Sequence, residues 1–257
     1  MYTAAMKHTP LQPPSTQRSS TRHAIMRLLI AWCLLGSIGC SAVPREREDA
    51  EYVLVYLKSG PTSGTGDKAQ RSTMFAGHMA NIQRLADERS LLIAGPFTKP
   101  EDKALRGILL MDVPTISQAQ ELAATDPGVQ AGEFVADAHA LRAAPSLRQT
   151  YELEQAMLAQ ATAQPTSQTP APGSPPPNIR AYVMVTAEDF DRTRRAVGES
   201  VWKERIVWSG QFTGTGRGVL VLDAPVASEV RAGLTNPGAC SIDGWWSTTS
   251  LTRLPKQ

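Results

Sequence analysis

The sequence predicts an α+β protein in which two copies of a small unit follow one another and pack together as a barrel. The main observation is an internal repeat, because residues 93–128 and 208–238 carry Gly, Phe and Thr in register before an apolar run that ends in Asp-x-Pro. A second observation is an uncharged segment with six prolines between the repeats, at residues 160–178. The third is hydrophobic periodicity, which predicts the same order of elements on both sides of that segment. The shared positions are Gly95 and Gly210, Phe97 and Phe212, Thr98 and Thr213, Asp112 and Asp223, and Pro114 and Pro225.

In the first copy, alternating and helical patterns predict the order strand, helix, strand, strand, helix, strand. Met74, Met79, Ile82 and Leu85 are assigned to the apolar face of the first helix, and Thr115 is the expected N-cap of the second. The predicted bounds are Tyr52–Leu57, Lys68–Arg89, Leu91–Ala94, Gly107–Met111, Thr115–Ala124 and Glu133–Arg142.

The second copy repeats this order and so predicts a second unit of the same kind. This order is the ferredoxin-like βαββαβ arrangement, an antiparallel sheet with two helices on one face. One such sheet leaves its other face bare, so two tandem units that pack sheet to sheet are expected to form an intramolecular dimeric α+β barrel. The predicted bounds are Ala181–Val185, Ala187–Glu204, Ile206–Ser209, Gly218–Leu222, Val226–Leu234 and Gly244–Arg253.

The same patterns divide the chain into domains. Residues 51–145 form the first predicted domain and residues 179–257 the second. Between them, residues 146–178 hold a short helix at Ser146–Ala159 and the Pro-rich linker, whose composition is typical of a semi-rigid spacer.

Residues 1–39 are interpreted as an N-terminal extension and signal peptide, followed by a short tether at 40–50. Basic Arg27, the apolar stretch from Leu28 to Ile38 and the Gly39–Cys40 pair have the layout of a bacterial lipoprotein signal. The apolar stretch is too short to span a bilayer. We therefore expect lipidation at Cys40 and a membrane-anchored protein of the bacterial cell envelope that faces the periplasm. The start residue (Met1 or Met26) and the membrane that holds the anchor (inner or outer) are left open.

Charge and cysteine content narrow the function classes. Residues 1–39 hold four basic residues and no acidic one, so their removal changes the formal net charge from +2 to −2. This balance argues against a nucleic-acid partner. Only Cys240 is then left as a free thiol, so no intramolecular disulfide is expected. The dispersed His and Cys residues indicate no metal site, and we expect no cofactor.

The repeat separates residues that the fold requires from residues present in one copy alone. His78 and Asp126 belong to the second group. Alignment on the Gly-x-Phe-Thr positions places Thr193 opposite His78, and alignment on Pro-Gly places Asn236 opposite Asp126. Neither Thr nor Asn can act as an acid or base near neutral pH, so any acid/base site is expected once per chain. His139, on the last strand of the first copy, is expected at an edge or on the surface.

The segment GHMANIQRLADERSLLIAGP and the later ATDPGVQAGEF resemble the YCII-related domain family of small dimeric α+β barrel proteins. The recurring residues of that family are a helix-borne histidine, a Gly-Pro after the second strand and an Asp-Pro after the second helix. They correspond here to His78, Gly95–Pro96 and Asp126–Pro127, with Gly132 also matching. The resemblance covers residues 51–144 and, more faintly, 179–254.

The resemblance implies a His78–Asp126 dyad in a cleft beside the sheet and a fold shared with muconolactone-isomerase-like enzymes. Family members with known chemistry act on small hydroxylated aromatic or lactone-like compounds, which implies an isomerase or lyase type of reaction. A carboxylate that holds a neutral imidazole makes it a better oriented base. Arg71, Gly95 and Pro96 are the candidates for substrate binding.

A different interpretation remains open for the same residues. His78 is also compatible with a packing role in its helix, and Asp126 with the Asp-Pro-Gly turn alone. The protein would then be a non-catalytic envelope lipoprotein that binds a ligand or a protein, and further oligomerisation is left open.

Overall fold

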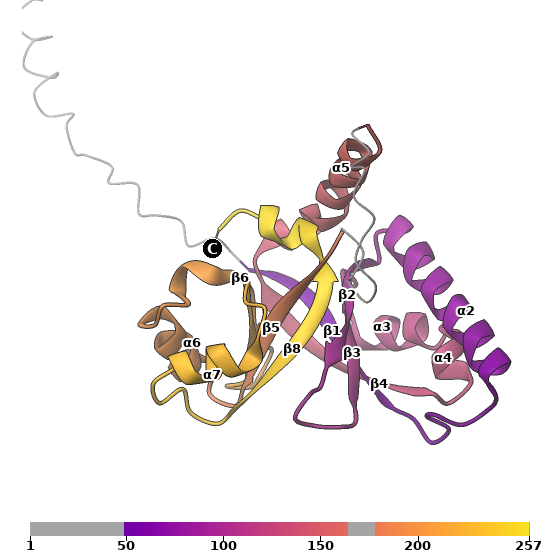
Figure 1. Cartoon of the computed structure of the whole chain (residues 1–257), viewed down its shortest axis with the longest axis horizontal. Coiled ribbons are helices and arrows are strands. Elements are labelled where there is room, and N and C mark those ends of the chain that lie inside the picture. The colour runs from indigo at the N-terminus through magenta and orange to yellow at the C-terminus, as the bar shows by residue number, and fades with distance from the viewer. Residues whose placement is uncertain (1–48, 164–177, 257) are drawn as a thin grey trace, which may run out of the picture. The chain divides into compact units, whose positions relative to one another are not determined.

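The computed structural model describes residues 49–163 and 178–256, here called the first and second halves, and their strands close into an antiparallel barrel (Figure 1). The order around the barrel is β1-β3-β2-β8-β5-β7-β6-β4. The first half contributes β1 (Ala50–Ser59), β2 (Leu91–Thr98), β3 (Leu105–Met111) and β4 (Phe134–Ala143), and the second half β5 (Ile179–Ala187), β6 (Ile206–Phe212), β7 (Gly218–Leu222) and β8 (Cys240–Thr248). The α+β content and the closed barrel confirm the predicted fold class at this level.

Helices follow the strands in the predicted places, with four differences. A short additional helix, α4, follows α3, a 3₁₀ turn (η2) precedes β6, and the helix expected after the first half is divided into a 3₁₀ turn (η1) and α5. The last strand, predicted as Gly244–Arg253, begins earlier and ends at Thr248, and residues 249–253 form a 3₁₀ turn (η3) instead. Thr115 caps α3 as predicted, since its hydroxyl accepts a hydrogen bond from the Gln118 N–H at 3.2 Å. The helices are α2 (Lys68–Asp87), α3 (Ile116–Ala123), α4 (Pro127–Gln130), α5 (Thr150–Ala163), α6 (Phe190–Gly198) and α7 (Ala227–Gly233), and the 3₁₀ turns are η1 (Pro145–Gln149), η2 (Lys203–Arg205) and η3 (Thr249–Arg253).

The repeated Gly-x-Phe-Thr segments lie where the two halves join. Phe97 in β2 pairs with Trp245 in β8, and Phe212 in β6 pairs with Leu141 in β4. The Trp245 indole N–H donates to the Gly95 carbonyl at 3.0 Å, and a Cβ at Gly95 would clash with the backbone of the next residue of β8. Glycine is therefore required there by the close approach of two strands.

The main hydrophobic core fills the inside of the barrel and is shared between the halves. Ten buried residues come from each half, with Tyr52, Leu54, Tyr182, Trp208 and Trp245 among the largest. Strand residues of the opposite parity face outward. Those of the first half pack under α2 and α3, and those of the second half under α6 and α7, so that each half keeps its own helices (Figure 1).

The buried face of α2 differs from the predicted one. Ile82 and Leu85 pack on the core as expected, but Met79 is 48% exposed, and His78 and Asn81 are buried instead. The reason is α4, which packs against α2: a Cβ placed on Gly77 would lie 3.0 Å from the Pro127 side chain. A pattern based on apolar residues alone could not show a helix face that is partly polar.

The N-terminal signal, Cys40 and the Pro-rich linker at 164–177 lie outside the described residues. Within residues 49–163 and 178–256, none of the helices combines the length and apolar character needed to cross a membrane.

Candidate functional site

His78 and Asp126 are brought together although they are 48 residues apart in the sequence. His78 projects from the middle of α2, and Asp126 is the N-cap residue of α4. The His78 Nδ1 atom lies 2.6 Å from the Asp126 Oδ2 atom. The two residues are 7% and 1% exposed, respectively. The structure therefore contains the hydrogen-bonded pair that a His-Asp dyad requires.

The Asp126 carboxylate is held on both of its oxygens. Oδ1 accepts the Gly128 N–H at 2.7 Å, the usual bond of an aspartate N-cap, and Oδ2 accepts a longer bond of 3.4 Å from the Asn81 amide. A Cβ at Gly128 would lie 2.6 Å from the Phe134 ring, so glycine lets the turn approach β4 closely. The Asp-Pro-Gly sequence thus forms a turn and also orients the carboxylate toward His78.

The electrostatic balance keeps Asp126 ionised near neutral pH. Burial by itself raises the pKa of the Asp126 carboxyl, but the hydrogen bond and charge of His78 and the bonds from Gly128 and Asn81 outweigh it, so that the pKa lies below the ordinary value of 3.8. Of the two neutral imidazole tautomers, an ionised carboxylate at Nδ1 favours the one that has its proton on Nδ1. The Nε2 atom then carries the lone pair that a general base uses.

Asn81 is a supporting residue that sequence reasoning missed. Its Oδ1 atom accepts from Arg84 at 2.8 Å and from the Thr125 hydroxyl at 3.1 Å, which turns its amide nitrogen toward Asp126. The sequence could have indicated Asn81 by its spacing, because a residue three positions after His78 lies on the same face of a helix.

Aromatic side chains surround the His78 imidazole. The ring centroids of Phe134 and Phe75 lie 5.3 Å and 5.8 Å from that of His78. Phe75 is 54% exposed, and Met79, next to His78 in sequence, is also exposed. The imidazole therefore sits at the inner end of an apolar surface that continues to the outside of α2.

The other residues considered for substrate binding lie apart from this pair. Arg71, in the exposed first turns of α2, donates to the Gly64 carbonyl at 3.3 Å. Gly95 and Pro96 belong to β2 at the join with β8, and among the described contacts neither touches His78 or Asp126.

The second half has no acid/base pair at the corresponding place. The Thr193 hydroxyl donates to the Pro237 carbonyl at 2.7 Å, and Asn236 is bonded by Arg192. Thr193, aligned with His78, and its neighbour Arg192 thus both contact the 236–237 turn, which is aligned with the Asp126 turn.

His139, expected at an edge or on the surface, is half-buried on β4, with its side chain 33% exposed. Its Nε2 atom lies 3.0 Å from Asp137, whose carboxylate also accepts from Lys58 at 2.7 Å, and its ring packs near Tyr56 and Phe212. Burial raises the pKa of Asp137, but its hydrogen bonds from Lys58 and His139 outweigh this and lower it. His139 thus contacts β1, its neighbour within the first half, and β6, which only the closed barrel brings beside β4.

Comparison with known proteins gives one family match. The model of the YCII-related domain matches residues 51–137, which include β1, both members of the His78–Asp126 pair and the start of β4. Among curated proteins, none matches the chain significantly. Residues 51–137 of this chain are therefore similar to the YCII-related domain.

Proposed function

We propose that the first half is an acid/base site in which His78 removes a proton from a small organic molecule and Asp126 orients and stabilises the imidazole. The observation that carries the proposal is the 2.6 Å bond between Nδ1 and a buried, ionised carboxylate. This bond leaves Nε2 as the base, and the imidazolium formed on proton transfer would be stabilised by the adjacent negative charge.

The surroundings favour a small, partly apolar substrate. Phe75 and Phe134 flank the imidazole, and Met79 extends the apolar surface outward. These groups supply contact area but no charge, so the reaction they support is proton transfer of an isomerase or lyase type. Hydroxylated aromatic and lactone-like compounds fit this description and are the class that the family resemblance implies.

The proposal extends to the architecture. The second half repeats the order of elements of the first and supplies half of the barrel core, but it has Thr193 and Asn236 at the positions aligned with His78 and Asp126. We take it as a degenerate ferredoxin-like copy of the first, so that the chain is an intramolecular pseudo-dimer with one site.

A non-catalytic binding role is the second candidate, and one observation favours it. The His78 side chain is only 9% exposed, and aromatic rings lie beside it, so a substrate reaches Nε2 only if Phe75 or its neighbours move. In that case the dyad fixes α2 to α4, and the exposed Phe75 and Met79 bind a ligand or a protein.

The two candidates are separated by hydrogen–deuterium exchange into carbon acids. Phenols, hydroxyquinols and lactones are incubated with the full chain in D₂O and followed by NMR. We expect exchange that falls by about 10²-fold or more in His78→Gln, the usual contribution of a general base, while His139→Gln keeps the wild-type rate. Equal losses in both variants, or exchange no faster than in buffer, would instead support the binding role.

We further propose that the protein is exported and anchored through lipid on Cys40, on the basis of the signal-like residues 26–40. In a bacterial host, the chain should fractionate with membranes and incorporate labelled palmitate, and Cys40→Ser should lose both properties. Label retained in Cys40→Ser would rule out this site of lipidation.

A further inference from the structure

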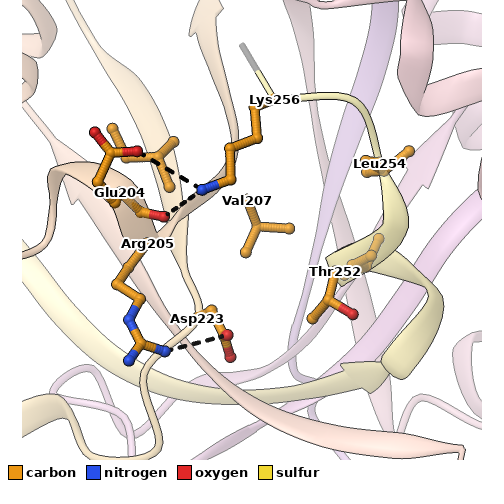
Figure 2. A pocket seen from close by; sticks show the side chains of 9 residues that line it. Glu204, Arg205, Val207, Asp223, Thr252, Leu254 and Lys256 are labelled. Atoms are coloured by element: carbon orange, nitrogen blue, oxygen red, sulfur yellow. Dashed lines mark hydrogen bonds and ion pairs between the residues drawn. The ribbon is translucent and has the colours of Figure 1, made fainter.

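A pocket in the second half lies outside the His78 site and plays no part in its chemistry. Its volume is about 310 Å³, at the lower end of the range for small-molecule sites. Figure 2 shows Glu204, Arg205 and Lys256 on one side of the pocket and Thr252 and Leu254 on the other. The lining residues belong to the segment that leads into β6, to the end of β7 and to η3 with the residues after it.

The inner surface of the pocket is apolar. Val207, Leu251 and Leu254 line it, and each of them is buried at the edge of the barrel core. Ile206 adds a further aliphatic side chain. An apolar body of a small ligand would therefore remove hydrocarbon surface from water on both sides of the contact.

The charged groups at the rim are only loosely paired. Arg205 approaches the Asp223 carboxylate at 3.6 Å, and the Lys256 ammonium approaches the Glu204 carboxylate at 3.7 Å, both beyond hydrogen-bond distance. Lys256 donates instead to the Glu204 backbone carbonyl at 3.0 Å (Figure 2). Asp223 is already held by two bonds from Arg180, at 2.7 and 3.1 Å. Arg205 and Lys256 thus face the two carboxylates of the lining without a direct side-chain bond to either, and Asp223 is engaged by Arg180, which does not line the pocket.

The first half supplies an internal comparison, because an equivalent backbone hydrogen bond, here called the backbone frame, occurs in both halves. The Asp112 N–H donates to the Ser90 carbonyl at 3.0 Å, and the Asp223 N–H donates to the Arg205 carbonyl at 2.8 Å. In both halves an arginine binds this aspartate directly, since Arg148 binds Asp112 at 2.7 and 2.8 Å just as Arg180 binds Asp223.

The start of α5 adds further contacts in the first half. Arg89, which corresponds to Glu204, pairs with Glu152 at 2.5 Å, and its guanidinium lies 3.7 Å from the Tyr151 ring centroid. The first half therefore uses these positions for packing within the chain. The second half keeps the frame but leaves the rim cations Arg205 and Lys256 without a close carboxylate partner.

We propose that this pocket binds a small apolar monocarboxylate. Its hydrocarbon part lies on Val207, Leu251 and Leu254, and its carboxylate is bound by Arg205 and Lys256. A planar carboxylate suits the guanidinium fork of Arg205, and Lys256 supplies a second cation at the same rim. The proposal is independent of proton transfer at His78, because it involves different elements of the other half.

Benzoate is the probe, with benzyl alcohol as its uncharged counterpart, titrated into the ¹⁵N-labelled full chain and followed by amide chemical shifts. We expect saturable shifts at Val207 and Leu251–Leu254 with benzoate and much weaker ones with benzyl alcohol. Arg205→Gln and Lys256→Gln should each weaken benzoate binding by about two- to fivefold, the range for exposed ionic contacts.

Two further variants give the controls. Arg253→Gln removes an exposed cation of η3 that does not line the pocket, and its affinity should equal that of the wild type. Thr252→Phe places a ring at the exposed rim without touching the core and should abolish the shifts. Equal binding of benzyl alcohol, unchanged affinity in both charge variants, or shifts centred on α2 instead would overturn the proposal.

Discussion

At the residue scale, the buried Asp126 carboxylate is stabilised by three donors that come from two parts of the chain. His78 and Asn81 reach it from α2, and the Gly128 N–H comes from its own turn. A buried charge without such partners is strongly unfavourable. Asp126 therefore links the geometry of the site to the stability of the α2–α4 contact.

This linkage predicts a specific pH dependence for Asp126→Asn. Because the folded-state pKa of Asp126 lies below 3.8, its contribution to stability is present above that value and is lost as the pH falls through the folded-state pKa. We expect the variant to be less stable than the wild type by roughly 1–3 kcal/mol at pH 6. The difference should shrink steadily below about pH 4.

Urea unfolding from pH 6 to pH 2.5 measures this difference. Asp49→Asn is the matched control, because Asp49 is exposed at the start of the described residues. A stability difference for Asp126→Asn that stays constant across this range would contradict an ionised, hydrogen-bonded carboxylate.

At the scale of the element, α2 is stabilised through one face, and two substitutions test which face it is. Leu85 is fully buried in the outer core, whereas Met79 is exposed. We expect Leu85→Ala to lower the free energy of unfolding by about 2–5 kcal/mol. Met79→Ala should change it by less than about 0.5 kcal/mol, as at other exposed positions. Chemical denaturation gives both values, and comparable losses would place Met79 in the core after all.

The β2–β8 join gives a second prediction at this scale. In Gly95→Ala the new methyl group would meet the β8 backbone and lie 2.8 Å from the Trp245 indole nitrogen, so the strands must move apart. We expect a loss of roughly 2–4 kcal/mol. Gly198→Ala, at the end of α6, adds a methyl group with no described atom within 4 Å and should be neutral or slightly stabilising. Thermal unfolding of both variants tests the contrast, which similar Tm values would contradict.

At the scale of the whole molecule, the two halves depend on each other for their core. Each contributes ten buried residues to the inside of the barrel, and strand pairing crosses between them at β2–β8 and β4–β6. Separation would expose the large aromatic residues of this shared core to water. The halves should therefore fold and unfold together rather than as separate domains.

Cleavage between the halves tests this dependence. With a protease site inserted in the Pro-rich segment at 164–177, the cut chain should stay associated on size-exclusion chromatography and unfold in one transition. Denaturant should separate the fragments only as secondary structure is lost. Fragments that separate in native buffer with their secondary structure intact would show that each half is stable alone.

Several features could be predicted from the sequence because they depend on local patterns. Period-2 and period-3.6 hydrophobicity gave the order of elements in each half, and the cap at Thr115 followed from its position before an apolar helix. The repeat also distinguished the shared Gly95 and Gly210 from His78, which occurs in the first half alone. The structure then placed His78 beside Asp126, in agreement with the family resemblance.

Other features were decided only by the tertiary structure, because they depend on contacts between distant segments. The polar face of α2 follows from the docking of α4, which makes Asn81 a supporting residue and leaves Met79 outside. His139 has Phe212 as a neighbour only because β6 of the second half lies beside β4 in the closed barrel. Periodicity along a chain shows which residues share a face, but strand register and helix docking determine what that face meets. The sequence by itself therefore determined the elements and the candidate pair, and the packing of the barrel determined their surroundings.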